Sequence, residues 1–206
     1  LYGEADLAKM KEIGIELWGL RADSIEQFIE ALRDLGSKIS IESSIDEYVS
    51  KIQSAQALAQ ANKPAQPVTA VILMDGYIAG KDSFYADVVR AAGAEPLGPA
   101  SNKFEKLSPE SLIELNPDVI LDVNQQALDQ FVNATTNEYE KAKRADRVLV
   151  RVIRGELVSD PRWKSINAIK TRSIASVLPD AMLRKGGRVD VLITEIANFL
   201  GSVTQR

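Results

Sequence analysis

The most regular hydrophobic pattern in the chain lies over residues 42–63. Apolar residues recur there at a helical spacing, with polar residues on the opposite face: Ile45, Tyr48, Val49, Ile52, Ala55 and Ala59. Ser43 or Ser44 can cap the start, and Pro64 follows the end. No glycine or proline interrupts the segment, so it predicts a rigid helix roughly 28 Å long. We expect it to link two α/β lobes, because the cleft between two lobes commonly holds a ligand.

The residues before this helix predict only part of an α/β lobe. One amphipathic helix precedes a strand at 15–20, and a second starts with the capping-box pair Ser24 and Gln27 and ends at Gly36. Two helices and one strand cannot cover each other as a full lobe. We therefore interpret residues 1–41 as the remainder of an N-terminal α/β lobe whose beginning is missing.

The residues after the long helix alternate between buried strands and helices. Strands are expected at 69–74, 118–123, 148–153 and 172–178, and helices at 83–93, 108–116, 125–145, 162–170 and 188–201. The segments 75–82 and 179–187 are expected to be loops. This order predicts a mostly parallel sheet with right-handed crossovers, and hence a C-terminal α/β lobe over 64–206. The fold class is α/β, with two lobes joined by one long helix.

Composition excludes several functions. The 206 residues carry a net charge of −4, which gives no basic surface for nucleic acid. The chain contains neither cysteine nor histidine, which excludes disulfides, thiolate metal sites and a Ser-His-Asp triad. We expect no catalytic residues, no resident metal and no cofactor.

Candidate ligand-binding residues follow from the predicted sheet. Ligands of open parallel sheets meet the loops at the carboxyl ends of the strands. Those loops carry a cationic, aromatic-bearing set that suits an anionic ligand, although single members can equally be solvated loop charges. The set, with Tyr2 added from the start of the chain, is Arg21, Tyr77, Lys81, Asn124, Asp180, Arg184 and Arg188. The segment GYIAGKDS (76–83) does not have the spacing of a phosphate loop.

Three stretches together resemble a known family. AGKDSFYADVVRAAGAEPL, KLSPESLIELNPDVIL and DPRWKSINAIKTRSIASVLPDAMLRKGGRVDVLITEIANFL resemble the C-terminal lobe of an extracytoplasmic solute-binding protein. The group concerned serves ABC importers for vitamin B12, haem and iron-siderophores. IGIELWGLRADSIEQFIEALRDLG resembles the second half of its N-terminal lobe, and 42–63 its linking helix. The order of these stretches, rather than any one motif, carries the resemblance.

The resemblance implies particular roles. Glu110 matches the acidic residue that docks on arginines of the permease, although a carboxylate there also suits a helix N-terminus. Tyr77, Gly80 and Lys81 match a loop that covers the ligand, and the segment 180–188 matches another loop lining the cleft. Corrinoid and haem binders often present aromatics where this chain has Ala181 and Met182.

The resemblance also implies a ligand, a partner and a location. The ligand is expected to be an iron-siderophore or a related metal chelate such as haem, with cobalamin as the alternative. The absence of histidine argues against the manganese and zinc branch. The partner is an ABC transporter permease, and the protein is expected to be a monomer, periplasmic or a cell-surface lipoprotein. Two further hypotheses are an enzyme on a two-lobe α/β scaffold and a sensor domain that reads a ligand without importing it.

Overall fold

The computed structural model describes residues 4–15, 22–124, 129, 133, 137, 148–150, 155–183 and 188–204. Within these ranges the helices are α1 Glu4–Glu12, α2 Ile25–Ile39, α3 Glu42–Ala61, α4 Phe84–Ala91, α5 Pro109–Leu115, α8 Gly155–Ser159, the 3-10 helix η1 Pro161–Trp163, α9 Asn167–Lys170, α10 Pro179–Leu183 and α11 Val189–Thr204. The strands are β1 Thr69–Met74, β2 Tyr77–Ala79, β3 Glu95–Pro96, β4 Phe104–Lys106, β5 Val119–Val123, β6 Leu149–Val150 and β7 Ile174–Val177. Across the described residues, no helix combines the length and the apolar character needed to cross a membrane.

One mixed sheet lies at the centre, as the predicted α/β class requires. Its strand order is β4-β2-β1-β5-β7-β6, and β3 pairs with β1 beside β2. The central pairs β1·β5 and β5·β7 are parallel, and so is β1·β3. The edge strands β2, β4 and β6 run antiparallel to their neighbours. The parallel centre is what the buried apolar runs predicted, because such strands are covered on both faces.

Helices cover both faces of this sheet and divide its side chains between two cores. Ala70 and Ile72 of β1 belong to one core with α2, α3, α4 and α11. Val71 and Leu73, the alternate residues of the same strand, belong to the other core with α5 and α9. This alternation follows from the two-residue period of a strand.

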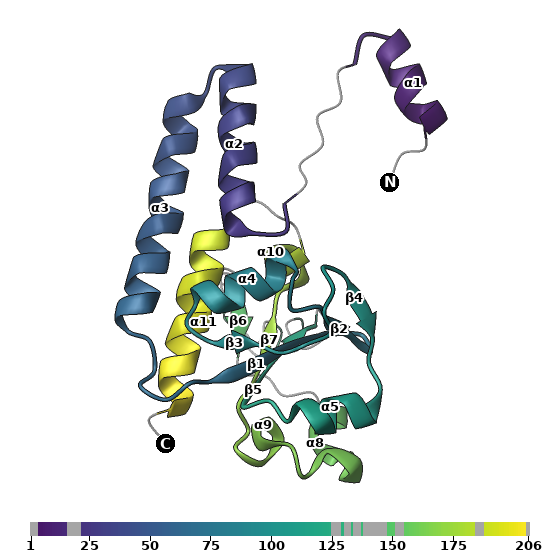
Figure 1. Ribbon diagram of the computed structural model, residues 1–206, viewed down its shortest axis with the longest axis vertical. Helices are drawn as coiled ribbons and strands as arrows, with labels where there is room; N and C mark the ends of the chain where they lie inside the picture. Colours follow the sequence, from purple (N-terminus) through teal and green to yellow (C-terminus); the bar gives the residue numbers. More distant parts are fainter. Residues whose placement is uncertain are drawn as a thin grey trace.

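The long helix α3 is continuous over its 20 residues, as predicted for residues 42–63. Figure 1 shows α2 and α3 as an antiparallel pair that rises away from the sheet, with the lower half of α3 beside α11 and α1 standing apart. The predicted cap at Ser43 or Ser44 is wrong: the helix begins at Glu42 after Ile41, which makes no side-chain cap. Only Ser40 and Ile41 connect α2 to α3, so the chain enters the second helix before either serine is reached.

Two helices extend past the glycines that were predicted to end them. α2 continues through Gly36 to Ile39 and ends at the left-handed Ser40, and α11 continues through Gly201 to Thr204. A glycine inside a helix costs only about 1 kcal/mol, which tertiary packing can offset. The predicted caps at Ser24, Ser83 and Ser108 are confirmed, since each hydroxyl accepts a backbone N–H of the first turn.

Two expected loops contain regular structure. Residues 75–79 form a hairpin with β1, in which Asp75 and Gly76 have φ of 47° and 83° and join β1 to β2. Two successive residues with positive φ are the mark of a tight hairpin turn, for which Asp-Gly is a preferred sequence. The expected loop over 179–187 opens with the helical turn α10. Of the expected strand over 148–153, residues 149–150 form β6. The expected strand at 15–20 and nearly all of the expected helix at 125–145 lie outside the described residues.

Candidate functional site

The carboxyl ends of the central parallel strands meet at one edge of the sheet. Leu73 of β1 is in register with Asp122 of β5, and Val123 of β5 with Val177 of β7. The segments that follow these strands, at Asp75, Asn124 and Pro179, therefore come together at that edge, where open sheets bind ligands. This edge is the candidate functional site.

A buried amide and a buried carboxylate lie at the centre of the edge. The side chain of Asn124 donates to the carboxylate of Asp122 at 3.3 Å, and its backbone N–H donates to the carbonyl of Val177 at 3.2 Å. Asp122 is 0% and Asn124 7% exposed. Asn124 thus ties β5 to β7 at the point where both strands end, and its polar group lies just below the surface of the site.

The hairpin separates two residues that the sequence placed in one loop. Tyr77 stays at the carboxyl edge opposite Met74, and 45% of it is exposed. The strand β2 then runs back along β1, so Lys81 lies farther from that edge. Lys81 is exposed, and its backbone N–H donates to the carbonyl of Pro99 at 2.9 Å.

Asp180 and Arg188 flank the segment after β7. Asp180 lies in α10, and Arg188 directly precedes α11, where its carbonyl accepts the N–H of Leu192 at 2.9 Å. Three other candidates, Tyr2, Arg21 and Arg184, lie outside the described residues.

The positions that were compared with ligand-contacting aromatics do not face a cleft. Ala181 and Met182 are 6% and 1% exposed and belong to the core formed with α2, α3, α4 and α11. They are buried because α10 packs against α11, where the two side chains join that core. Their small or flexible side chains therefore do not separate a corrinoid from another ligand.

Glu110 lies at the start of α5, which packs on the other face of the sheet from α4 and α11. Its carboxylate is exposed, and the nearby hydroxyl of Ser108 caps the helix by accepting the N–H of Ser111 at 3.0 Å. A cationic group that acts on it is Arg162 of η1, whose pKa is raised mainly by hydrogen bonds to Asp160 and slightly by Glu110. Arg162 is held by the Asp160 carboxylate at 2.6 Å, which leaves the Glu110 carboxylate open to solvent.

Sequence reasoning missed two polar features of the site. The Asp-Gly turn was available as a hairpin signal between two apolar stretches. Ser176 is 1% exposed and lies in register with Asp122. The sequence did not indicate this burial, because serine is mostly an exposed residue.

Solved structures of two periplasmic proteins share the fold of this chain. The periplasmic heme-binding protein RhuT from Roseiflexus sp. RS-1 aligns with 99% of this chain over 73% of its own length, with a TM-score of 0.71 and 18% identity. The periplasmic vitamin B12 binding protein BtuF of Vibrio cholerae aligns with 99% of this chain over 72% of its own length, with a TM-score of 0.67 and 11% identity. At such identities the likeness is one of fold.

A curated relative and a family profile extend the comparison to sequence. The chain is 20% identical over 203 residues to the "Uncharacterized ABC transporter substrate-binding lipoprotein YvrC" of Bacillus subtilis (strain 168). The alignment covers 94% of this chain and 56% of that protein, so the chain spans a little over half the length of this relative. The sequence profile of a periplasmic binding protein family matches residues 11–181, which is most of the chain. This chain therefore belongs to the periplasmic binding protein family.

Proposed function

We propose that this chain acts as the extracytoplasmic substrate-binding component of an ABC importer. It captures an iron-siderophore or a related metal chelate such as haem and delivers it, chemically unchanged, to a permease. The observation that carries the proposal is the unbroken α3, which rises with α2 out of the α/β unit inside a chain of this family. Its curated relative is named a substrate-binding lipoprotein, which supports a location outside the cytoplasm.

In this proposal α3 divides the chain. Residues 1–41 belong to an N-terminal lobe, 42–63 form the link, and 64–206 form the C-terminal lobe. A helix without a break resists bending, so the lobes close on the ligand by a small movement. The ligand lies against the edge where β1, β5 and β7 end, with Tyr77 and Asn124 at that edge and Lys81 farther back, on the loop after β2.

The cationic candidate residues of the sequence indicate the chemical class of the ligand. Lys81, Arg184, Arg188 and Arg21 suit a ligand that carries carboxylates or other anionic groups, as haem and many ferric siderophores do. Cobalamin, which the structural relative from Vibrio cholerae binds by its name, is the alternative. Asp180 is the one acidic member of the set and would meet a hydrogen-bond donor of the ligand.

A titration with three probes tests the proposal. Hemin, an anionic ferric tricatecholate chelate and cyanocobalamin are added to the full-length protein, and tryptophan fluorescence and probe absorbance are followed. We expect saturable binding of hemin or the ferric chelate without turnover. Lys81→Met and Arg188→Met should each weaken binding about tenfold, which corresponds to one lost charged hydrogen bond. Lys170→Met is the matched control. Lys170 is an exposed residue of α9, on the face of the sheet that α5 and α9 cover.

Three results would contradict the proposal. Absence of any response to all three probes argues against a chelate-binding protein. Chemical conversion of a bound probe indicates an enzyme. A signalling response that persists after deletion of the permease indicates a sensor. A loss of melting temperature in Arg188→Met at unchanged affinity would assign Arg188 a structural role at the start of α11.

A further inference from the structure

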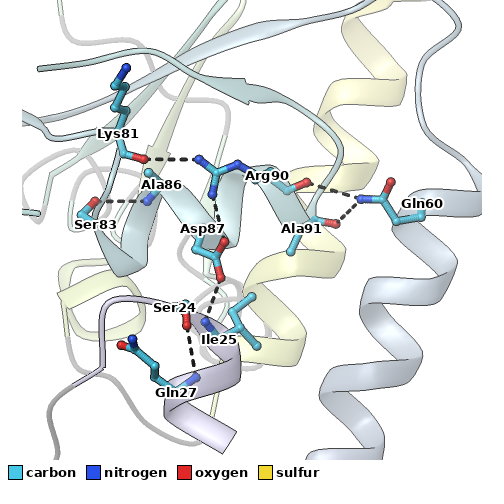
Figure 2. A network of polar contacts seen from close by, with 10 residues as sticks. All are labelled: Ser24, Ile25, Gln27, Gln60, Lys81, Ser83, Ala86, Asp87, Arg90 and Ala91. Carbon is cyan, nitrogen blue, oxygen red and sulfur yellow. Dashed lines mark hydrogen bonds and ion pairs between the residues drawn. The ribbon is translucent and has the colours of Figure 1, made fainter. Parts of the chain in front are cut away.

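Helix α4 lies between the start of α2 and the end of α3 and is hydrogen-bonded to both. The carboxylate of Asp87 on α4 accepts the backbone N–H of Ile25 at the start of α2, at 2.8 Å and across 62 residues of sequence. The side chain of Gln60 on α3 donates to the carbonyls of Arg90 and Ala91 at the end of α4, at 3.4 and 3.3 Å (Figure 2). The N–H of Ile25 lies in the first turn of α2 and has no partner within its own helix. The carbonyl of Arg90 also accepts the N–H of Gly93 at 3.0 Å, just past the end of α4.

Arg90 extends this connection to the candidate ligand loop. One guanidinium nitrogen donates to Asp87 at 2.9 Å, and the other donates to the backbone carbonyl of Lys81 at 3.3 Å (Figure 2). The planar guanidinium presents several donors in fixed directions, so it can hold a carboxylate and a carbonyl at once. The start of α2 and the backbone of Lys81 are thus joined through the pair Asp87–Arg90.

A second route joins the same two places. The N–H of Asp82 donates to the carbonyl of Ser101 at 3.1 Å, and the side chain of Asn102 donates to the carboxylate of Asp23 at 3.2 Å. The approach of the two segments depends on Gly80, because a Cβ there would collide with the carbonyl oxygen of Ser101. The two routes close a ring of contacts from Asp23 and Ile25 to the loop of Lys81 and back.

Aromatic packing also holds α2 against α4. The rings of Phe28 on α2 and Phe84 on α4 meet edge to face at 5.6 Å, and both residues are buried. Tyr85 continues the contact to Phe104 of β4 at 5.2 Å. This aromatic packing fixes how close α2 and α4 can come, whereas the hydrogen bonds described above fix the orientation and register of the two helices.

We infer that Asp87 and Arg90 are positioning residues, which hold the Lys81 loop and the start of α2 in one geometry. A ligand that touches Lys81 can then change the orientation of the α2–α3 pair, because the guanidinium of Arg90 and the carboxylate of Asp87 connect the Lys81 loop to the start of α2. The part of this inference that concerns a ligand depends on the proposed function. The mechanical coupling between the loop and α2 does not.

Amide hydrogen exchange on the full chain tests the coupling without a ligand. In Asp87→Ala, we expect amides of residues 25–28 and 80–83 to exchange at least fivefold faster than in the wild type. In Asp87→Asn, the amide oxygen can still accept the N–H of Ile25, so residues 25–28 should recover while residues 80–83 stay fast. In Arg90→Met, residues 80–83 should be fast, and the effect on residues 25–28 smaller, because Asp87 still accepts from Ile25.

Arg33→Met is the matched control for Arg90→Met. Arg33 is an exposed residue of α2 with one long ion pair to Asp46 at 3.8 Å, so its loss should leave both segments unchanged. Exchange rates in Asp87→Ala and Arg90→Met that match those of Arg33→Met at both segments would overturn the inference, as would a uniform increase over the whole chain.

Adding hemin or the ferric tricatecholate chelate separates this inference from the proposed function. With a probe that binds, exchange of residues 25–28 should slow in the wild type and slow clearly less in Arg90→Met, where only the route through Asn102 and Asp23 remains, even when each protein is saturated. Equal slowing in both proteins would overturn the coupling. If no probe binds while the variants still loosen residues 25–28 and 80–83, the proposed function fails and the coupling stands.

Discussion

Gly36 of α2 lies so close to Ile45 of α3 that a Cβ on the glycine would be 2.7 Å from Cγ1 of the isoleucine. Both residues are buried where the two helices pack. Gly36→Ala should therefore destabilise the protein by about 1–2 kcal/mol, since overpacking outweighs the gain of about 1 kcal/mol in helix propensity. Urea unfolding followed by circular dichroism measures the change in the free energy of unfolding.

Gly201→Ala is the matched control for this substitution. Gly201 also lies inside a helix, but a Cβ added to it would have no neighbouring atom within 4 Å. Only the propensity term applies there, so Gly201→Ala should stabilise the protein by up to about 1 kcal/mol. Equal and stabilising effects at both positions would show that α2 and α3 are not in close contact at Gly36.

The start of α11 is capped by a tyrosine from α3. The N–H of Val189 donates to the hydroxyl oxygen of Tyr48 at 3.0 Å, and Val189 is buried. Tyr48→Phe should lower the free energy of unfolding by about 1–3 kcal/mol, because it leaves a buried donor without its acceptor. Tyr85→Phe, which removes another half-buried hydroxyl, should have a smaller effect at neutral pH.

Stability should also fall at alkaline pH through Tyr48. Burial, opposed by the hydrogen bond from Val189 and aided by the charge of Asp190, raises the pKa of Tyr48 from 10.0 to about 12. Because the unfolded state ionises first, this contribution is fully present below pH 10 and is lost as the pH rises through 12. Urea unfolding between pH 9 and about 11.5 should show a shallower decline in Tyr48→Phe than in the wild type. Identical slopes would contradict the raised pKa.

Asp118 joins the amino ends of β1 and β5. Its carboxylate accepts the backbone N–H of Thr69 at 3.0 Å, the hydroxyl of Thr69 at 2.7 Å and the side chain of Asn167 at 3.3 Å. Burial acts to raise the pKa of Asp118, but these hydrogen bonds together lower it from the ordinary value of 3.8. The carboxylate therefore contributes stability above pH 3.8, and this contribution is lost as the pH falls through the folded-state pKa.

Asp118→Ala should lower the free energy of unfolding by about 1–3 kcal/mol at neutral pH. The difference from the wild type should shrink as the pH falls below about 4, measured by urea unfolding at a series of pH values. Asp46→Ala removes an exposed carboxylate in a weak ion pair and should change stability by less than about 0.5 kcal/mol. A difference between Asp118→Ala and the wild type that stays constant down to about pH 2 would be inconsistent with the lowered pKa.

Glu110 and Glu114 provide a matched pair for the proposed permease contact. Both are exposed on α5, one turn apart. Glu110→Ala should weaken binding to a purified cognate permease at least tenfold at low salt, because an exposed carboxylate that faces arginines speeds association and fixes the orientation of the two proteins. Glu114→Ala should leave binding unchanged, because Glu114 is not the residue proposed to face the permease. The melting temperature should move little, since an acid at an exposed helix start contributes at most about 1 kcal/mol. Equal affinities of the two variants would remove Glu110 from the interface.

Local signals in the sequence were enough to predict most elements of the fold. Ser83 and Ser108 each cap a helix through an N–H only three residues away, so the cap is visible in a short window of sequence. The apolar runs at 69–74 and 118–123 predicted buried parallel strands for the same reason, and α3 was predicted from its own periodicity. The edge where Tyr77 and Asn124 lie also followed, because strand ends in a parallel sheet share one side.

Tertiary structure decided the features that depend on a partner far away in sequence. From the sequence alone, Gly36 is predicted to end a helix, and its close contact with Ile45 is visible only in the packed structure. The role of Asp87 depends on Ile25, which lies 62 residues earlier. Ala181 and Met182 lie in a segment that was predicted to be a loop, and the packing of α10 against α11 buries them. A sequence specifies which residues can bond or pack, but the partner is chosen by the arrangement of helices and strands that satisfies all such contacts at once.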